Sequence, residues 1–197
     1  MTKVVALASS PSTGGNTDKL LAHFLRGAED AGGRVHRIAV AELEIEGWTP
    51  EVECPEGDSP QVEDDFDRVS QELVAADVIV VASPVYFRNV PAQLKALIDR
   101  SQCQWIRKYV DKKPLPASSA GHRRRRGVLI STGGNDREHF AGTIQTIKSF
   151  SDVYEADYWG ELLFAGVDAT EIEKEPLAFQ QAYDLGFRAV TNAWGEE

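Results

Sequence analysis

The chain has 197 residues, which suits a single domain over residues 1–197 and leaves too little length for two. Its net charge of -10 argues against a nucleic-acid partner, because a polyanion would be repelled over most of the surface. No apolar run reaches the ~20 residues of a membrane span, and residues 1–7 lack the long apolar stretch of a signal peptide. We therefore expect a cytoplasmic protein with no membrane partner.

Apolar runs typical of strands alternate with segments of helical period along the whole chain. Helices are expected to start near Thr17, 62, Pro91, Ala141 and Glu173, and an acidic, proline-rich stretch over 42–60 predicts a long loop. Strands separated by helical crossovers pair in parallel, so the alternation predicts an α/β fold with three layers and a doubly wound, five-stranded parallel sheet. The order 2-1-3-4-5 of flavodoxin-like folds is expected by analogy. The expected strands are 4–8, 35–40, 77–82, 127–131 and 152–165.

Unusual loops follow three of these strands, at 9–17, 83–90 and 131–136. Ligands of such sheets bind beyond the carboxyl ends of the strands, so we expect the three loops to converge on one crevice. The first loop combines hydroxyls, an amide and two glycines ahead of a helix N-terminus, where free backbone N–H groups and the helix dipole favour a phosphate. The alternative for this loop is a helix cap with a flexible turn.

Other phosphate chemistry is excluded by the residues of the first loop. No lysine follows Gly15, as a P-loop would require, and the chain has no G-x-G-x-x-G fingerprint with an acidic residue after the second strand. Neither Cys54 nor Cys103 lies in the loop, so a cysteine-nucleophile phosphatase would lack its nucleophile. We therefore expect a loop that binds and does not hydrolyse.

Two blocks carry a family resemblance over roughly residues 3 to 165. The first runs from Ser10-Pro11 to Gly15-Asn16-Thr17, and the second joins S-P-V-Y at 83–86 to K-x-x-I-D-R at 95–100. Together they resemble the NADPH-dependent FMN reductase family, which includes the iron–sulfur flavoproteins. The resemblance implies an FMN-dependent oxidoreductase that passes electrons from NADPH or NADH to a quinone, a flavin or another small acceptor. It also implies a homodimer or homotetramer.

The resemblance further implies which residues bind FMN. Tyr86 is expected to shape the acceptor side, and the hydride step requires no side-chain acid or base. Ordinary core packing is the alternative for the two aromatic residues Tyr86 and Phe87. The FMN phosphate is expected on Ser10, Ser12, Asn16 and Thr17. The ribityl chain and flavin ring are expected against Pro84, Val85, Tyr86 and Phe87. The pyrimidine edge of the ring is expected near Thr132, Gly133 and Gly134.

Two departures from the family pattern affect these expectations. Ser12 stands where many relatives have a basic residue, so the phosphate cradle is expected to be neutral. Only Cys54 occurs in the segment that carries the cluster cysteines of iron–sulfur members, so neither a cluster nor another metal site is expected.

Three questions stay open at this stage. A flavodoxin-type electron carrier without its own hydride chemistry is the alternative function, and a flavin-free binding module is a weaker one. The basic run Arg123–Arg126 is either a solvated strand edge or a patch for the extra phosphate of NADPH or a subunit contact. Trp48, Trp105 and Tyr109 belong either to a subunit interface or to the core.

Overall fold

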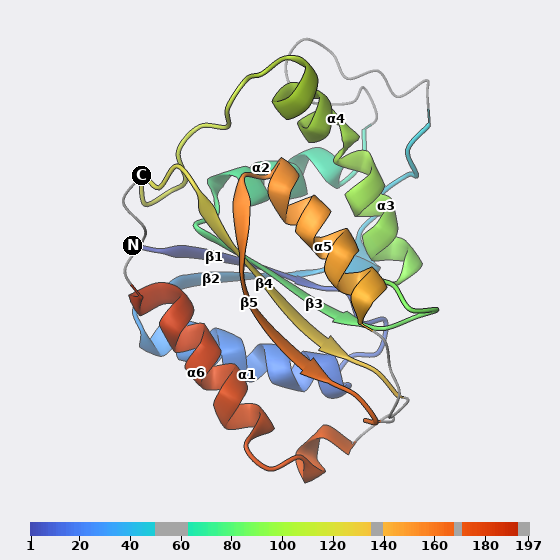
Figure 1. Ribbon diagram of the computed structural model, residues 1–197, viewed down its shortest axis with the longest axis vertical. Coiled ribbons are helices and arrows are strands. Elements are labelled where there is room, and N and C mark those ends of the chain that lie inside the picture. The colour runs from blue at the N-terminus through green and yellow to red at the C-terminus, as the bar shows by residue number, and fades with distance from the viewer. Residues whose placement is uncertain (50–62, 135–139, 168–170, 193–197) are drawn as a thin grey trace.

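A computed structural model describes residues 1–49, 63–134, 140–167 and 171–192, and the structural statements below refer to these residues. Its five strands form one sheet in the order β2-β1-β3-β4-β5, and each neighbouring pair is parallel (Figure 1). The predicted fold class and strand order are therefore confirmed. The strands are β1 (Lys3–Ala8), β2 (Arg34–Ala39), β3 (Val78–Pro84), β4 (Arg125–Thr132) and β5 (Ala156–Phe164).

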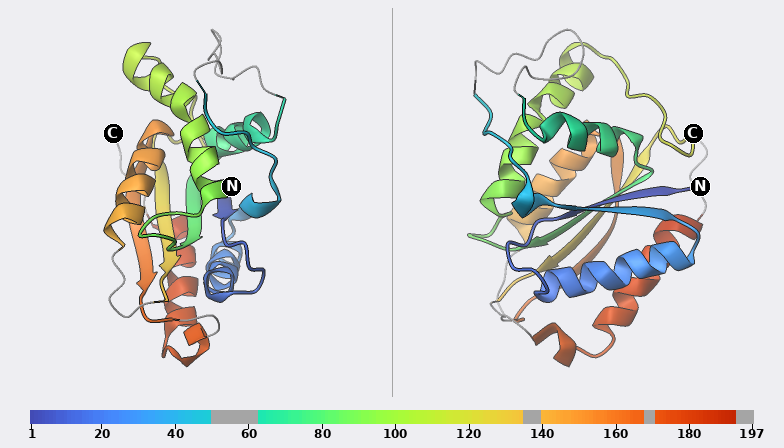
Figure 2. Two further views of the ribbon diagram at one scale, coloured as in Figure 1. Left: turned by 90° about the vertical axis from the view of Figure 1, so that its right-hand side faces the viewer. Right: turned by 180° about the vertical axis from the view of Figure 1, so that it is seen from behind.

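Helices cover both faces of the sheet, as Figure 2 shows from two further sides. The helices α1 (Asn16–Asp30) and α6 (Ala178–Thr191) pack on one face, and α2 (Phe66–Ala75), α3 (Ala92–Arg100) and α5 (Ala141–Val153) lie on the other. The short α4 (Gln102–Trp105) and a π-helical turn over Ile106–Val110 continue α3, and the 3₁₀ turns are Val40–Glu42 and Glu171–Lys174.

The core lies in two apolar layers, one on each side of the sheet. Val5 and Leu7 of β1 belong to the layer under α2, α3 and α5, whereas Val4 and Ala6 belong to the layer under α1 and α6. This alternation follows from the period of two along a strand. The central strands β1 and β3 are buried on both faces, which explains their continuous apolar sequence.

Several boundaries differ from the sequence-based expectation. The strand expected over 152–165 begins only at Ala156, because the apolar side chains of Phe150 and Val153 keep α5 in helical contact with the core. The final helix begins at Ala178 and not near Glu173, since Pro176 interrupts the segment. Residues 43–49 are irregular, as expected, and the rest of the acidic stretch up to residue 62 lies outside the described residues.

No helix in the described ranges has the length and apolar character needed to cross a lipid bilayer.

Candidate functional site

Three loops meet at the carboxyl ends of β1, β3 and β4, and Thr132 at the end of β4 connects them. Its hydroxyl lies 2.7 Å from the hydroxyl of Thr17 in the first turn of α1. Its carbonyl oxygen accepts a hydrogen bond from the Val85 N–H at 2.9 Å. We call residues 9–15, 84–90 and 132–134 the loop cluster. The cluster lies at the point where the strand order reverses, which is where doubly wound sheets bind their ligands.

The first loop runs from Ser9 to Gly15 and leads into α1. Ser9 is buried and bonded to β3 through the carbonyl oxygen of Ala82. Gly14 has a φ of 74°, a left-handed conformation that glycine adopts without strain. A Cβ atom on Gly15 would lie 3.3 Å from the Ser12 carbonyl oxygen. The two glycines therefore let the loop fold back closely in front of the helix N-terminus.

The donors of this loop are hydroxyls and backbone amides. The hydroxyl of Ser10 lies 3.2 Å from both the N–H and the carbonyl oxygen of Ser12. The side chains of Ser12 and Thr13 are exposed, and no hydrogen bond within the described part of the chain uses their hydroxyls. The first amides of α1 have no acceptor within the helix, and the helix dipole makes this end positive. The loop thus offers several neutral donors and no cationic side chain.

Asp18 places a carboxylate beside these donors. Its Oδ2 accepts a hydrogen bond from the Gly14 N–H at 3.1 Å, and Arg37 of β2 donates to both carboxylate oxygens at 3.2 and 3.3 Å. The Gly14 amide therefore already has an anionic partner at the helix N-terminus. A phosphate on this loop has to use the remaining donors or displace the carboxylate.

Two of the residues expected to touch the cofactor make contacts with neighbouring segments of the protein. The Asn16 amide donates to the Val167 carbonyl oxygen at 3.1 Å and accepts from the Ile172 N–H at 3.3 Å. The Gly133 N–H donates to the Phe164 carbonyl oxygen at 2.9 Å. Asn16 thereby ties α1 to the segment after β5, and the Gly133 amide is engaged at the end of β5. Gly134 is exposed beside it.

The second loop contains a tight turn over Tyr86–Asn89. The N–H of Tyr86 bonds to the carbonyl oxygen of Asn89 at 2.8 Å, and the reverse bond is 2.9 Å long. Phe87 and Arg88, the two central residues, have φ values of 48° and 62°. Positive φ at both positions defines a type I′ turn, which glycine and asparagine normally occupy. Each larger residue in this conformation costs roughly 1–2 kcal/mol.

Contacts with α5 hold this strained turn in place. The Asn89 Oδ1 accepts hydrogen bonds from the Val90 N–H at 2.8 Å and from the Thr146 hydroxyl at 3.0 Å. At Gly142, in the first turn of α5, an added Cβ would lie 2.4 Å from the Arg88 carbonyl oxygen. The turn therefore packs against α5 at a distance that only glycine permits.

The aromatic residues of the turn lie outside the core. Tyr86 is 45% exposed and Phe87 is fully exposed, so the core alternative for them is wrong. Trp105 and Tyr109 are 43% and 40% exposed on the extension of α3, whereas Trp48 is half-buried. Pro84 and Val85, which precede the turn, are half-buried.

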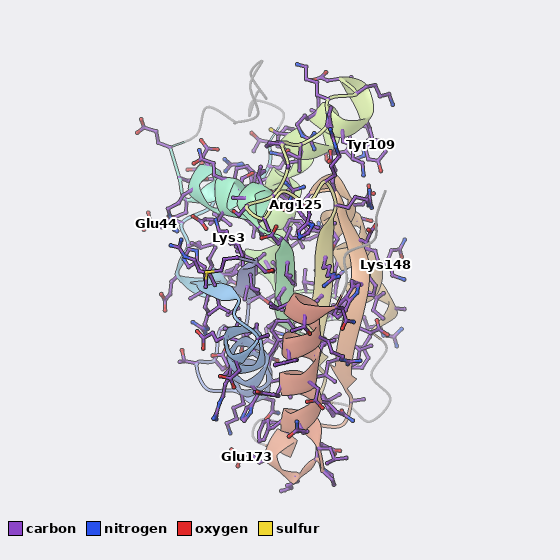
Figure 3. The ribbon with its side chains drawn as sticks, turned by 90° about the vertical axis from the view of Figure 1, so that its left-hand side faces the viewer. Lys3, Glu44, Tyr109, Arg125, Lys148 and Glu173 are labelled. Carbon is purple, nitrogen blue, oxygen red and sulfur yellow. The ribbon has the colours of Figure 1, made fainter. Side chains whose placement is uncertain are left out.

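The basic run lies at the opposite end of the sheet. Arg125 and Arg126 begin β4 and are buried, about 20–23 Å along the strand from Thr132, so neither a solvated edge nor a phosphate patch describes them. Arg125, which Figure 3 labels, is 1% exposed. Burial lowers the pKa of both guanidinium groups, and in Arg125 the nearby Glu155 and Asp77 oppose this shift. The sequence-based alternatives for these two residues were wrong, because both side chains are buried and bind backbone carbonyl oxygens within the protein.

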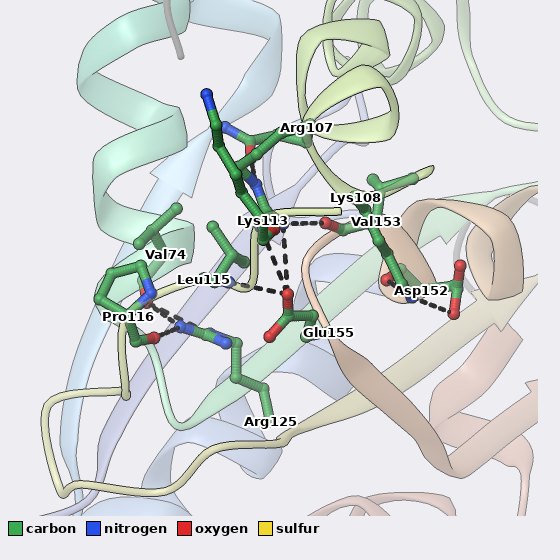
Figure 4. Close-up of polar contacts among 11 residues, drawn as sticks. Val74, Arg107, Lys108, Lys113, Leu115, Pro116, Arg125, Asp152, Val153 and Glu155 are labelled. Atoms are coloured by element: carbon green, nitrogen blue, oxygen red, sulfur yellow. Dashed lines mark hydrogen bonds and ion pairs between the residues drawn. The ribbon is translucent and has the colours of Figure 1, made fainter. Parts of the chain in front are cut away.

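Three buried arginines bind carbonyl oxygens in the C-terminal turns of three helices. Arg125 donates to the Val74 carbonyl oxygen of α2 at 2.5 Å and Arg126 to the Ala189 carbonyl oxygen of α6 at 2.9 Å. Arg107 donates to the Val153 carbonyl oxygen at the end of α5 at 3.3 Å (Figure 4). In a parallel sheet with helical crossovers, helix C-termini lie at the amino ends of the strands, where positive charge complements the helix dipole.

Comparisons with known proteins identify the family of the chain. Residues 2–166 match the family model described as NADPH-dependent FMN reductase. The chain belongs to this family. It is 27% identical to an iron–sulfur flavoprotein of Methanosarcina thermophila over 90% of this chain and 88% of that protein. It is 35% identical to an FMN-dependent NADH:quinone oxidoreductase of Polaromonas naphthalenivorans over 49% of each chain.

A solved structure of an azoreductase from Bacillus anthracis has the same fold. It superposes with a TM-score of 0.69 at 17% identity, covering 95% of this chain and 100% of that chain. At the level of its family, the protein described here is an FMN-dependent NAD(P)H oxidoreductase.

Four residues of the candidate site were missed by sequence reasoning. Asp18, Arg88, Asn89 and Gly142 all take their roles from contacts that span a turn or join two segments. The only sequence signal among them was Asn89, because asparagine is typical of tight turns. The last two residues of the third expected loop, 135 and 136, lie outside the described residues.

Proposed function

We propose that the protein holds FMN in the loop cluster and transfers electrons from NADH or NADPH to a small acceptor such as a quinone or a flavin. The observation that carries the proposal is the convergence of the three loops on Thr132, in a chain of the FMN reductase family. The exposed Tyr86 and Phe87 give this edge of the sheet an apolar surface, in addition to the first loop with its phosphate-binding donors.

The first loop fits the phosphate group of FMN. The free hydroxyls of Ser12 and Thr13 can donate to phosphate oxygens, and the amides at the start of α1 add donors with a favourable dipole. The space that Gly15 leaves beside the Ser12 carbonyl would be reduced by any side chain. Since the loop has no cation, we expect phosphate binding through many neutral donors, with Asp18 limiting its strength.

The second and third loops fit the ring system. Tyr86 and Phe87 present flat apolar surface, and Thr132 positions the second loop against the third through its carbonyl oxygen. Bound FMN would accept a hydride from the reduced nicotinamide and pass electrons on to the acceptor. The side chains bind, orient and exclude water. We assign Tyr86 to the acceptor side because of its exposure.

A spectrum of the purified protein tests the proposal. We expect flavin absorbance after incubation with FMN, and bleaching of that absorbance when NADPH or NADH is added without oxygen. A protein that takes up no FMN, or whose bound FMN is not reduced by either nucleotide, would contradict it.

A pair of variants at Ser12 tests the phosphate assignment. Ser12→Glu places a carboxylate at the loop and should weaken FMN binding about tenfold or more, because like charges repel across a short distance. Ser12→Gln has nearly the same size without the charge and serves as the control. Riboflavin, which lacks the phosphate, should bind both variants equally. Equal FMN affinity of the two variants would place the phosphate elsewhere.

A flavodoxin-type carrier is the second candidate, and the net charge of -10 favours it because acidic surfaces suit docking to basic redox partners. Steady-state oxidation of NADPH with a neutral quinone separates the two functions. The proposed oxidoreductase turns over repeatedly, whereas a carrier oxidises almost no NADPH without a partner reductase.

A further inference from the structure

We propose that Arg88 is a specificity residue, whose guanidinium group binds phosphate oxygens of the reduced nicotinamide dinucleotide. The inference rests on the proposed function, because it assigns the second substrate of the same site. It starts from an arginine held in a conformation that arginine disfavours, at the edge of the sheet where ligands bind.

The backbone is the first line of support. Arg88 has a φ of 62° in a type I′ turn, directly after Phe87 at 48°. Neither residue gains packing from this conformation, since both side chains are exposed. Backbone strain that persists without a packing benefit is concentrated at functional sites. A glycine at residue 88 would adopt the turn without strain, so arginine at this position makes the protein less stable than glycine would.

Neighbouring residues fix the backbone of the turn, but none in the described part of the chain binds the guanidinium group of Arg88. Two backbone bonds close the turn, Asn89 bonds to Thr146, and the Arg88 carbonyl oxygen rests against Gly142. The guanidinium group itself has no hydrogen bond or ion pair with the described residues. A fixed backbone with an unpaired cationic side chain is suited to binding a ligand anion.

Charge at the loop cluster points to the same ligand chemistry. Arg88 is the only cationic residue in the segments 9–15, 84–90 and 132–134. The protein as a whole is acidic, so a dinucleotide with several negative charges is repelled by most of the surface. The first loop is expected to hold the FMN phosphate through neutral donors, which leaves Arg88 available for a second anion.

Three variants test the role of Arg88 in the FMN-loaded protein. Arg88→Gly removes the charge and relieves the strain, Arg88→Lys keeps the charge, and Arg123→Gly removes an exposed arginine at the far end of the sheet as a control. The donors are NADPH, NADH and N-benzyl-1,4-dihydronicotinamide, which is neutral and has no phosphate. The acceptors are a neutral naphthoquinone and its sulfonated analogue.

We expect Arg88→Gly to raise KM for NADPH and NADH about tenfold, the loss of one charge-assisted contact. KM for the neutral donor should stay unchanged, and Arg88→Lys should recover most of the loss. Calorimetric binding of NADP⁺ to the oxidised holoprotein should weaken by the same factor. Arg123→Gly should behave as the wild type. The unfolding midpoint of Arg88→Gly should be no lower than that of the wild type, because glycine accepts a positive φ.

Other outcomes overturn the proposal in distinguishable ways. A KM for NADPH that stays unchanged in Arg88→Gly, or rises equally for the neutral donor, shows that Arg88 does not bind donor phosphates. A change confined to the sulfonated quinone assigns the anion to the acceptor. Lower affinity for FMN with unchanged affinity for riboflavin assigns Arg88 to the cofactor phosphate. Failure of the wild type to take up FMN refutes the proposed function itself, whereas normal uptake with any of these results refutes only the role of Arg88.

Discussion

Single residues at the loop cluster act mainly by fixing backbone segments against one another. Thr132 joins three loops through one hydroxyl and one carbonyl group, and Asn16 ties the start of α1 to the segment after β5. Gly142 does the same through its missing side chain, because the Arg88 carbonyl oxygen occupies the space of a Cβ atom. The second loop thus depends on a residue more than fifty positions further along the chain.

Replacing Gly142 with alanine should displace the turn over Tyr86–Asn89. Alanine is the better helix former by about 1 kcal/mol, so helix propensity alone predicts stabilisation. The contact of 2.4 Å with a backbone oxygen predicts the reverse, a loss of about 1–3 kcal/mol. Thermal unfolding measures the sign, and Gly47→Ala, at a glycine with open space around it, is the control. A midpoint for Gly142→Ala at or above the wild type would show that the turn moves freely.

At the scale of elements, buried arginines complete the C-terminal turns of α2, α5 and α6. Arg125, Arg107 and Arg126 each donate to a carbonyl oxygen in one of these turns. Such carbonyls have no partner within their own helix, so a buried helix end needs a donor from elsewhere. The arginines supply both the donors and a positive charge at the negative end of each dipole.

Replacing Arg126 with methionine should destabilise α6 and leave the loop cluster intact. The variant loses hydrogen bonds to the carbonyl oxygens of Ala189 and Asn192, both 2.9 Å long. A buried acceptor left without its donor costs about 1–3 kcal/mol, which lowers the unfolding midpoint by roughly 2–12 °C for a domain of this size. Hydrogen exchange should quicken in the last turn of α6, whereas FMN affinity should not change.

Arg123→Met is the matched control, since Arg123 belongs to the same basic run but is exposed. Its unfolding midpoint should lie close to that of the wild type. Equal midpoints for the two variants would mean that the Arg126 contacts contribute nothing to the stability of α6.

These arginines also show where sequence reasoning reaches its limit. The alternation of strands and helices predicted a parallel, doubly wound sheet, and analogy with flavodoxin-like folds supplied the strand order. The meeting of the three loops follows from that topology. The carbonyl oxygens of Val74, Ala189 and Asn192 lie 51 to 66 residues from the arginine that binds them, and a backbone carbonyl leaves no mark in a side-chain pattern. The turn at Arg88 was missed for a related reason, since arginine is not a residue from which a positive φ is predicted.

At the scale of the whole molecule, the two ends of the sheet differ in electrostatic character. At the amino ends of the strands, buried arginines neutralise the helix C-termini. At the carboxyl ends, the N-terminus of α1 carries a positive dipole, and the described residues of the loops around it include exposed hydroxyls and Arg88, which has no ion pair within that part of the chain. An anionic ligand is thus favoured at one end only, although the protein carries a net charge of -10.

This polarity predicts how FMN should stabilise the protein. A ligand that binds only the folded state at about 100 times its Kd adds about 2.7 kcal/mol, equivalent to roughly 5–11 °C in the unfolding midpoint. Riboflavin at the same concentration should give a smaller shift, because it lacks the phosphate that the first loop binds. Hydrogen exchange should slow in residues 9–17, 84–90 and 132–134 and stay unchanged around Arg125 and Arg126. Equal shifts for the two flavins, or protection gained at the arginine end, would contradict binding at the carboxyl ends of the strands.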